Sequence, residues 1–225
     1  MGGALQFLFD GPADAPLTLI LAHGAGAPMD SPFMTFFAKG LAHHGWRVAR
    51  FEFPYMAARG AEGKRRPPDP PQVLTRTWRA AIAALAAGGG SGRLVIGGKS
   101  LGGRIASMIA DDAGVRGLVC LGYPFSPPRK ANAGMGRAAE AVTARIAHLK
   151  ILSTPALIVQ GTHDPFGGPE QVRSYDLAPS ITVHWLEDGD HGFVPRKASG
   201  RTAQQNQDEA LEAVAAFLAA RGGAG

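Results

Sequence analysis

The chain has 225 residues and a formal charge of +5, with 45% hydrophobic and 18% charged residues. This length and composition suit a globular domain with a sizeable core and exclude a disordered or fibrous chain. The basic residues are scattered, and their one cluster, at 59–66, lacks the interleaved aromatic side chains of a base-stacking surface, so we expect no nucleic-acid partner.

Cysteine content and hydropathy bear on the cellular setting. Cys120 is the only cysteine and lies in an apolar run, so we expect a buried thiol, no intrachain disulfide and no tetrahedral cysteine zinc site. We expect no cofactor and no metal. The N-terminus has neither a basic segment nor the apolar core of a signal peptide. The longest apolar stretches, 17–22 and 80–87, are too short to cross a bilayer, which predicts a cytoplasmic protein without a membrane partner.

Strand-like and helix-like runs alternate along the chain. The predicted strands are apolar runs bounded by glycine or proline, at 17–22, 46–53, 93–96, 115–121, 155–159 and 181–186. The predicted helices lie at 32–44, 70–87, 105–111, 137–148 and 170–175, with a last helix opened by a capping box of Thr202 and Gln205. Residues 55–71 are expected to be irregular. This alternation predicts an α/β fold in one domain over 1–225, with a doubly wound, mostly parallel sheet and helices on both faces.

The sequence from Gly98 to Gly102, Gly-Lys-Ser-Leu-Gly, fits the pattern G-x-S-x-G between a predicted strand and a predicted helix. A serine hydroxyl becomes a nucleophile only when it is exposed and oriented next to a base, and a sharp strand-to-helix turn exposes it. The turn is crowded, which explains the two glycines. We therefore predict that Ser100 is a nucleophile.

Two other interpretations of this segment are weaker. A phosphate-binding loop would need glycine five residues before Gly98, but that position is Arg93 and the residues between are strand-like. A purely structural glycine-rich turn is the remaining alternative.

The base is predicted to be His191, which lies in a loop between the last strand and the last helix. Such a loop lies at the carboxyl edge of a parallel sheet, from which its histidine can reach Ser100. His43, His44, His148 and His184 lie at helix ends or inside a strand, and we interpret them as structural.

The acid that orients the base is predicted to be Asp164, which closely follows the strand 155–159 and precedes His191 in the chain. Asp188 and Asp190 are rival acids, but as neighbours of His191 in the same loop they are less able to fold back onto its Nδ1.

The oxyanion of an acyl-transfer reaction needs backbone donors. We predict the N–H groups of Leu101, which follows Ser100, and of Ala25 in the small-residue segment 22–28, with Gly26 as a neighbouring candidate. His23 is expected to hold that segment by hydrogen bonds.

These residues together resemble the α/β-hydrolase superfamily, in its chain order of serine, acid and histidine. The segments Ala-His-Gly-Ala-Gly-Ala at 22–27 and Gly-Gly-Lys-Ser-Leu-Gly-Gly-Arg at 97–104 resemble those of a compact, poorly characterised, dienelactone-hydrolase-like branch of this superfamily. The resemblance implies a serine hydrolase of the carboxylesterase kind. Dienelactone hydrolases proper use a cysteine nucleophile, so their substrate is not carried over.

Two further features concern the substrate. Lys99 is unusual beside the nucleophile; it could attract an anion or lower the pKa of the serine, but a lysine pointing to the surface is the simpler expectation. Residues 126–151 leave room for a loop and one helix, so we expect minimal or no lid and a small-molecule acyl substrate.

Two alternatives stay open: a non-catalytic binding or scaffold protein, which scaffold-like relatives of this branch motivate, and a peptidase. The oligomeric state cannot be read from the sequence.

Overall fold

The computed structural model describes residues 5–87, 90–127 and 135–222. Within them, a seven-stranded sheet has the order β1-β3-β2-β4-β5-β6-β7. All neighbouring strands pair in parallel except β1, which runs antiparallel to β3 at one edge. The strands are β1 (Phe7–Asp10), β2 (Thr18–Ala22), β3 (Arg47–Phe51), β4 (Leu94–Lys99), β5 (Gly117–Leu121), β6 (Ala156–Gly161) and β7 (Ile181–Leu186).

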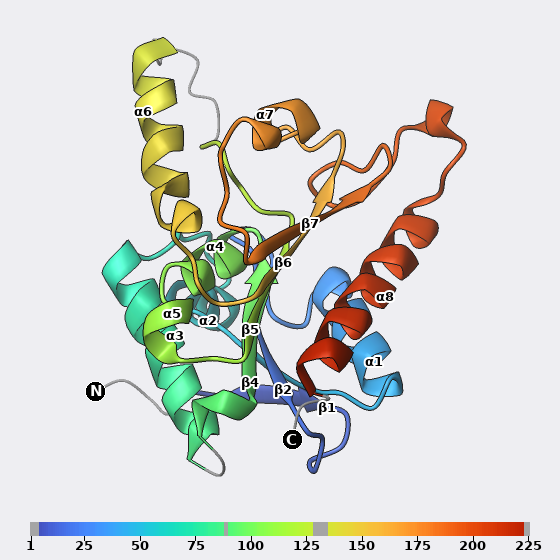
Figure 1. The fold of residues 1–225 in the computed structure, drawn as a ribbon. Helices are drawn as coiled ribbons and strands as arrows, with labels where there is room; N and C mark the ends of the chain where they lie inside the picture. Colours follow the sequence, from blue (N-terminus) through green and yellow to red (C-terminus); the bar gives the residue numbers. More distant parts are fainter. Residues whose placement is uncertain (1–4, 88–89, 128–134, 223–225) are drawn as a thin grey trace.

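Helices cover both faces of this sheet (Figure 1). One face packs against α1 (Pro32–His43) and α8 (Ala203–Gly222). The other face carries α2 (Pro54–Glu62), α3 (Pro71–Ala86), α4 (Leu101–Ser107), α5 (Ala110–Ala113), α6 (Met135–Ile146) and α7 (Pro169–Arg173). The predicted doubly wound α/β fold is therefore confirmed.

The sheet separates two hydrophobic cores because successive residues of a strand point to opposite faces. Leu19 and Leu21 of β2 pack in the core under α1 and α8, whereas Ile20 between them packs in the core under α3 and α4. Trp78 of α3 is fully buried there, and its indole Nε1 donates to the carbonyl oxygen of Gly102 at 3.2 Å. The helix that follows the predicted nucleophile is thus anchored to the core.

The prediction of an irregular stretch at 55–71 was wrong, because residues 54–62 form α2. Pro54 occupies the first turn, where its fixed φ favours helix and its missing N–H has no cost. Tyr55 and Met56 are buried, and the backbone N–H of Tyr55 donates to a carboxylate oxygen of Asp69 at 2.9 Å. These contacts with distant residues give a helix that the local composition did not indicate.

Other differences are smaller. β1 was not predicted, because it is a short edge strand whose apolar run is only three residues long and partly exposed. Asp10 of β1 accepts from Arg50 of β3 at 2.7 Å. The predicted helix at 105–111 is α4 followed by the separate short helix α5.

The capping box opens α8 as predicted, with the Thr202 N–H donating to Gln205 Oε1 at 2.8 Å and the Gln205 N–H to Thr202 Oγ1 at 3.2 Å. Gly88 and Gly89, expected to end a helix, and 128–134 of the loop around 126–136 lie outside the described residues. No helix of the described ranges is long and apolar enough to span a membrane.

Candidate active site

The predicted site residues meet at one edge of the sheet. Ser100 directly follows β4, Ala25 follows β2, Asp164 follows β6 and His191 follows β7. In a parallel sheet the carboxyl ends of the strands lie on the same edge, so these four loops converge there.

Ser100 occupies a strained turn between β4 and α4. Its φ of 49° and ψ of −109° are a backbone conformation that a residue with a side chain rarely adopts. A Cβ atom on Gly98 or Gly102 would lie 2.2 Å or 2.4 Å from the carbonyl oxygen of Ala22, so neither position has room for a side chain. This geometry is that of a nucleophile elbow.

The predicted base and acid form a chain of hydrogen bonds with the serine. His191 Nε2 is 2.9 Å from Ser100 Oγ, and His191 Nδ1 is 2.7 Å from Asp164 Oδ2. An ionised carboxylate can only accept, so Nδ1 carries a proton and donates it to Asp164. Nε2 is then the acceptor for the Ser100 hydroxyl.

Asp164 lies below the histidine with an exposed fraction of only 3%. Gln160 Nε2 donates to its Oδ2 at 2.9 Å, and the backbone N–H of Phe166 donates to its Oδ1 at 2.8 Å. The Phe166 ring meets the His191 ring edge to face, with centroids 4.6 Å apart. Both carboxylate oxygens therefore have fixed partners. Gln160 was not among the predicted site residues; its one signal in the sequence is a polar side chain near the end of an apolar strand.

The two rival acids are engaged elsewhere. Asp188 forms an ion pair with Arg196. One carboxylate oxygen of Asp190 accepts from the N–H groups of Gly192 and Val194, at 2.7 Å and 2.9 Å, and so shapes the loop that carries His191.

Lys99 points inward, against the simpler expectation that it would face the surface. Its Nζ donates to the carbonyl oxygen of His191 and lies 5.2 Å and 5.3 Å from the ring centroids of Phe33 and Phe193. Burial lowers the pKa of Lys99 to about 8. The carboxylates of Asp164 and Asp190 act in the opposite direction. The lysine thus links β4 to the His191 loop.

The loop after β2 is fixed by residues of α2 and the turn before it. His23 Nδ1 is 2.7 Å from the carbonyl oxygen of Gly24, and the Phe53 N–H donates to His23 Nε2 at 3.1 Å. Burial lowers the pKa of His23, which favours the neutral ring that these two bonds require. Arg59 of α2 donates to the carbonyl oxygen of Gly26 at 3.1 Å. The predicted holding role of His23 agrees with these contacts.

A cavity of about 620 Å³ opens at this edge. Ser100, His191, Leu101 and Ala25 all line it, and Phe33, Met34, Pro124 and Phe166 give it apolar walls. Within the described residues between β5 and β6, the elements are α6 and a short 3-10 turn, without a larger lid. Across residues 5–87, 90–127 and 135–222, no group of three or more His, Cys, Asp or Glu side chains is arranged to hold a metal ion.

Comparisons with solved structures show the same fold. An alpha-beta serine hydrolase homologue from Coxiella burnetii has 19% sequence identity over 95% of this chain and 91% of its own, with a TM-score of 0.66. A serine hydrolase without lid from Xanthomonas campestris has 19% identity over 95% of this chain and 89% of its own, with a TM-score of 0.65. An esterase domain from Rhodothermus marinus has 16% identity over 96% and 98%, with a TM-score of 0.62.

The family comparison covers nearly the whole chain. The model of the alpha/beta hydrolase domain matches residues 15–219, a range that contains β2 to β7 and all the predicted site residues. The resemblance inferred from the sequence is thereby confirmed, and this chain belongs to the α/β-hydrolase family.

Proposed function

We propose that this protein is a serine hydrolase that cleaves small ester-like acyl compounds through an acyl-enzyme intermediate. The observation that carries the proposal is the chain of hydrogen bonds from Ser100 through His191 to the buried Asp164, at the wall of a cavity of about 620 Å³.

The first half-reaction begins at Ser100. As Oγ attacks the acyl carbon, its proton passes to His191 Nε2, and the negative charge of Asp164 stabilises the imidazolium that forms. The tetrahedral oxyanion accepts from the backbone N–H groups of Leu101 and Ala25, which both line the cavity. When the intermediate collapses, the leaving alcohol takes the proton from Nε2, and the acyl group stays on Oγ.

The second half-reaction repeats these steps with water. His191 accepts a proton from the attacking water and returns it to Ser100 Oγ, and the carboxylic acid leaves. A water molecule can reach the acyl-enzyme because the described residues place no lid over Ser100.

The size of the substrate follows from the same cavity. Its walls are apolar near Ser100, and an unlidded site cannot enclose a long chain. We therefore favour a short acyl group over a lipid. The cytoplasmic location expected from the sequence belongs to this proposal and is checked by cell fractionation.

Pre-steady-state hydrolysis of 4-nitrophenyl acetate tests the mechanism. Wild type should release a rapid burst approaching one nitrophenolate per chain before the slower steady state, because acylation precedes deacylation. Ser100→Ala should show no burst. Cys120→Ala is the control, because Cys120 is fully buried and cannot act as a rival nucleophile. Equal turnover by wild type and Ser100→Ala would exclude the mechanism, and a scaffold protein would show no turnover with any variant.

A further inference from the structure

The cavity is lined by basic side chains and by no acidic ones among the described residues. The basic side chains are those of Lys99, Arg104 and Arg145. Cations that are partly removed from water are costly unless a negative group faces them. Lys99 lies near the carboxylates of Asp164 and Asp190, so Arg104 and Arg145 are the two lining cations whose negative partner is in question.

Arg104 lies on α4, the helix that begins directly after Ser100. The backbone N–H of Arg104 donates to the carbonyl oxygen of Ser100 at 2.9 Å, and both residues line the cavity. The side-chain Nε of Arg104 is buried and has no hydrogen-bond partner within the described residues. The Nε of Arg104 is thus a donor without an acceptor, on a residue that lines the cavity with Ser100.

Arg145 of α6 lines the same cavity. Its Nη1 donates to the carbonyl oxygen of Pro124 at 3.1 Å, which fixes the guanidinium without neutralising it. Burial lowers the pKa of Arg145, and the charge of Arg104 adds to this effect. The two guanidinium groups line one cavity, and their positive charges repel each other.

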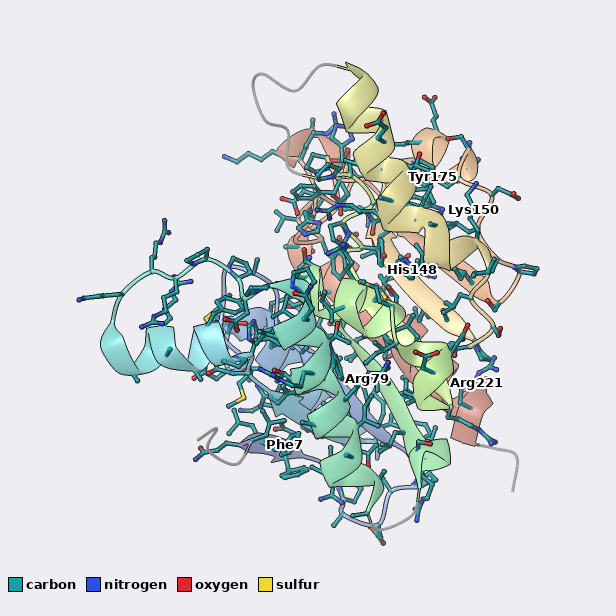
Figure 2. All side chains as sticks on the ribbon, turned by 90° about the vertical axis from the view of Figure 1, so that its left-hand side faces the viewer. Phe7, Arg79, His148, Lys150, Tyr175 and Arg221 are labelled. Carbon is teal, nitrogen blue, oxygen red and sulfur yellow. The ribbon has the colours of Figure 1, made fainter. Side chains whose placement is uncertain are left out.

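The groups beneath the arginines are neutral. His148 lies in the short 3-10 turn directly after α6 (Figure 2), and its Nε2 is 2.8 Å from Ser107 Oγ and 3.4 Å from the Tyr123 hydroxyl. Burial and the charge of Arg104 lower the pKa of His148 to about 4, so it is uncharged at neutral pH. Lys99 cannot neutralise the two arginines, because it is itself a cation, and its ammonium group donates to the His191 carbonyl oxygen.

We propose that Arg104 and Arg145 form a carboxylate-binding subsite, and that the natural substrate is a small ester carrying a carboxylate a few bonds from the scissile carbonyl. The proposal rests on the serine hydrolase function above and adds the substrate class. A planar carboxylate matches the fork of donors that a guanidinium presents, and it would neutralise the repulsion between the two arginines.

Two pairs of esters test the subsite. In each pair the carboxylate is replaced by a neutral amide of the same shape: monomethyl glutarate against methyl glutaramate, and 4-carboxyphenyl acetate against 4-carbamoylphenyl acetate. The first pair places the charge on the acyl part and the second on the alcohol part. Wild type should prefer the anion of at least one pair by about 10- to 100-fold in kcat/KM, the range expected for charge-assisted hydrogen bonds.

The variants separate a built subsite from general attraction. Arg104→Gln should abolish the preference, Arg145→Gln should reduce it, and Arg104→Lys should retain part of it. The control is Arg79→Gln, which removes one positive charge from α3. Arg79 does not line the cavity, and it forms an exposed ion pair with Asp112 (Figure 2). Arg79→Gln should keep the full preference.

A binding measurement makes the test independent of turnover. Glutarate should raise the Tm of wild type and of Arg79→Gln but not of Arg104→Gln. Hydrolysis of both members of each pair at equal rates would overturn the subsite and leave the serine hydrolase standing. If no ester is hydrolysed, a glutarate shift that Arg104→Gln abolishes supports the subsite without the ester chemistry, and its absence overturns the subsite.

Discussion

At the scale of single residues, the acid and the base depend on each other for their protonation states. Asp164 accepts from His191 Nδ1 and from Gln160, so its carboxylate fixes both the ring orientation and the tautomer. A neutral amide at this position would leave Nδ1 facing a group that can donate instead of accept.

Asp164→Asn should therefore lower kcat for 4-nitrophenyl acetate by about 10³- to 10⁴-fold, as removal of the acid's charge does in such triads. The matched variant is Asp188→Asn, which removes the same charge from the rival acid and should lower kcat far less, because Asp188 pairs with Arg196 whereas His191 Nδ1 donates to Asp164. Steady-state kinetics measure both. A larger loss in Asp188→Asn than in Asp164→Asn would reassign the acid.

Lys99 is a positioning residue in this account, since it touches the His191 backbone and not the reacting atoms. Lys99→Met keeps the length of the side chain and removes its charge. We expect kcat to fall about tenfold, the effect of losing one such hydrogen bond, with KM little changed. Unchanged kinetics would show that the contact does not position His191.

The stability of Lys99→Met against pH gives a second readout. Burial lowers the pKa of Lys99 from its ordinary 10.5 to about 8. Between these two pH values the unfolded chain holds the Lys99 proton more often than the folded chain, so the contribution of Lys99 to the free energy of unfolding should rise with pH from 8 to 10.5. Lys99→Met lacks this contribution. The difference in Tm between the two proteins should change across that window, and parallel curves would contradict the buried position of the charge.

The sequence located Ser100, His191 and Asp164 because each follows a strand, and position after a strand can be read along the chain. The inward direction of Lys99 and the contact between Gln160 and Asp164 could not be read in this way. Lys99 and His191 are 92 residues apart, and their contact depends on how loops from different strands converge.

At the scale of elements, the turn from β4 into α4 and the loop after β2 fit against each other. The glycines of the turn lie against the carbonyl oxygen of Ala22, and α2 holds the other side of the loop through Arg59. The pattern of glycines predicted this close packing. The helix α2 was missed because its buried side chains and its bond to Asp69 are contacts with distant parts of the chain.

Gly102→Ala should destabilise the protein by about 1–3 kcal/mol, the usual cost of overpacking, because its Cβ would lie 2.4 Å from a backbone oxygen that cannot move freely. It should also lower kcat, since the displaced backbone carries Ser100. Gly60→Ala in α2 is the control: its Cβ meets nothing within 4 Å, and alanine favours helix by about 0.5–1 kcal/mol. Urea unfolding measures both, and equal effects would argue against the tight fit at the turn.

At the scale of the whole molecule, the parallel sheet brings four loops to one edge and leaves the cavity without a large cover in the described residues. The alternation of strands and helices along the sequence predicted this architecture. The two arginines on the wall of the cavity could not be predicted. Arg104 comes from α4 and Arg145 from α6, and β5 separates these helices along the chain.

The open cavity predicts a preference for short acyl chains. Across nitrophenyl esters from acetate to decanoate, kcat/KM should be highest for the shortest chains, because the described walls offer a long chain little surface to bury against. A steady rise toward decanoate would show an acyl groove that the described residues do not form.

The account depends most on the nucleophilicity of Ser100, which a fluorophosphonate probe measures directly. Wild type should be labelled stoichiometrically, with the adduct mapped by mass spectrometry to the peptide containing Ser100, and Ser100→Ala should stay unlabelled. A wild type that resists the probe, or a Ser100→Ala variant that labels equally well, would contradict the assignment of this site.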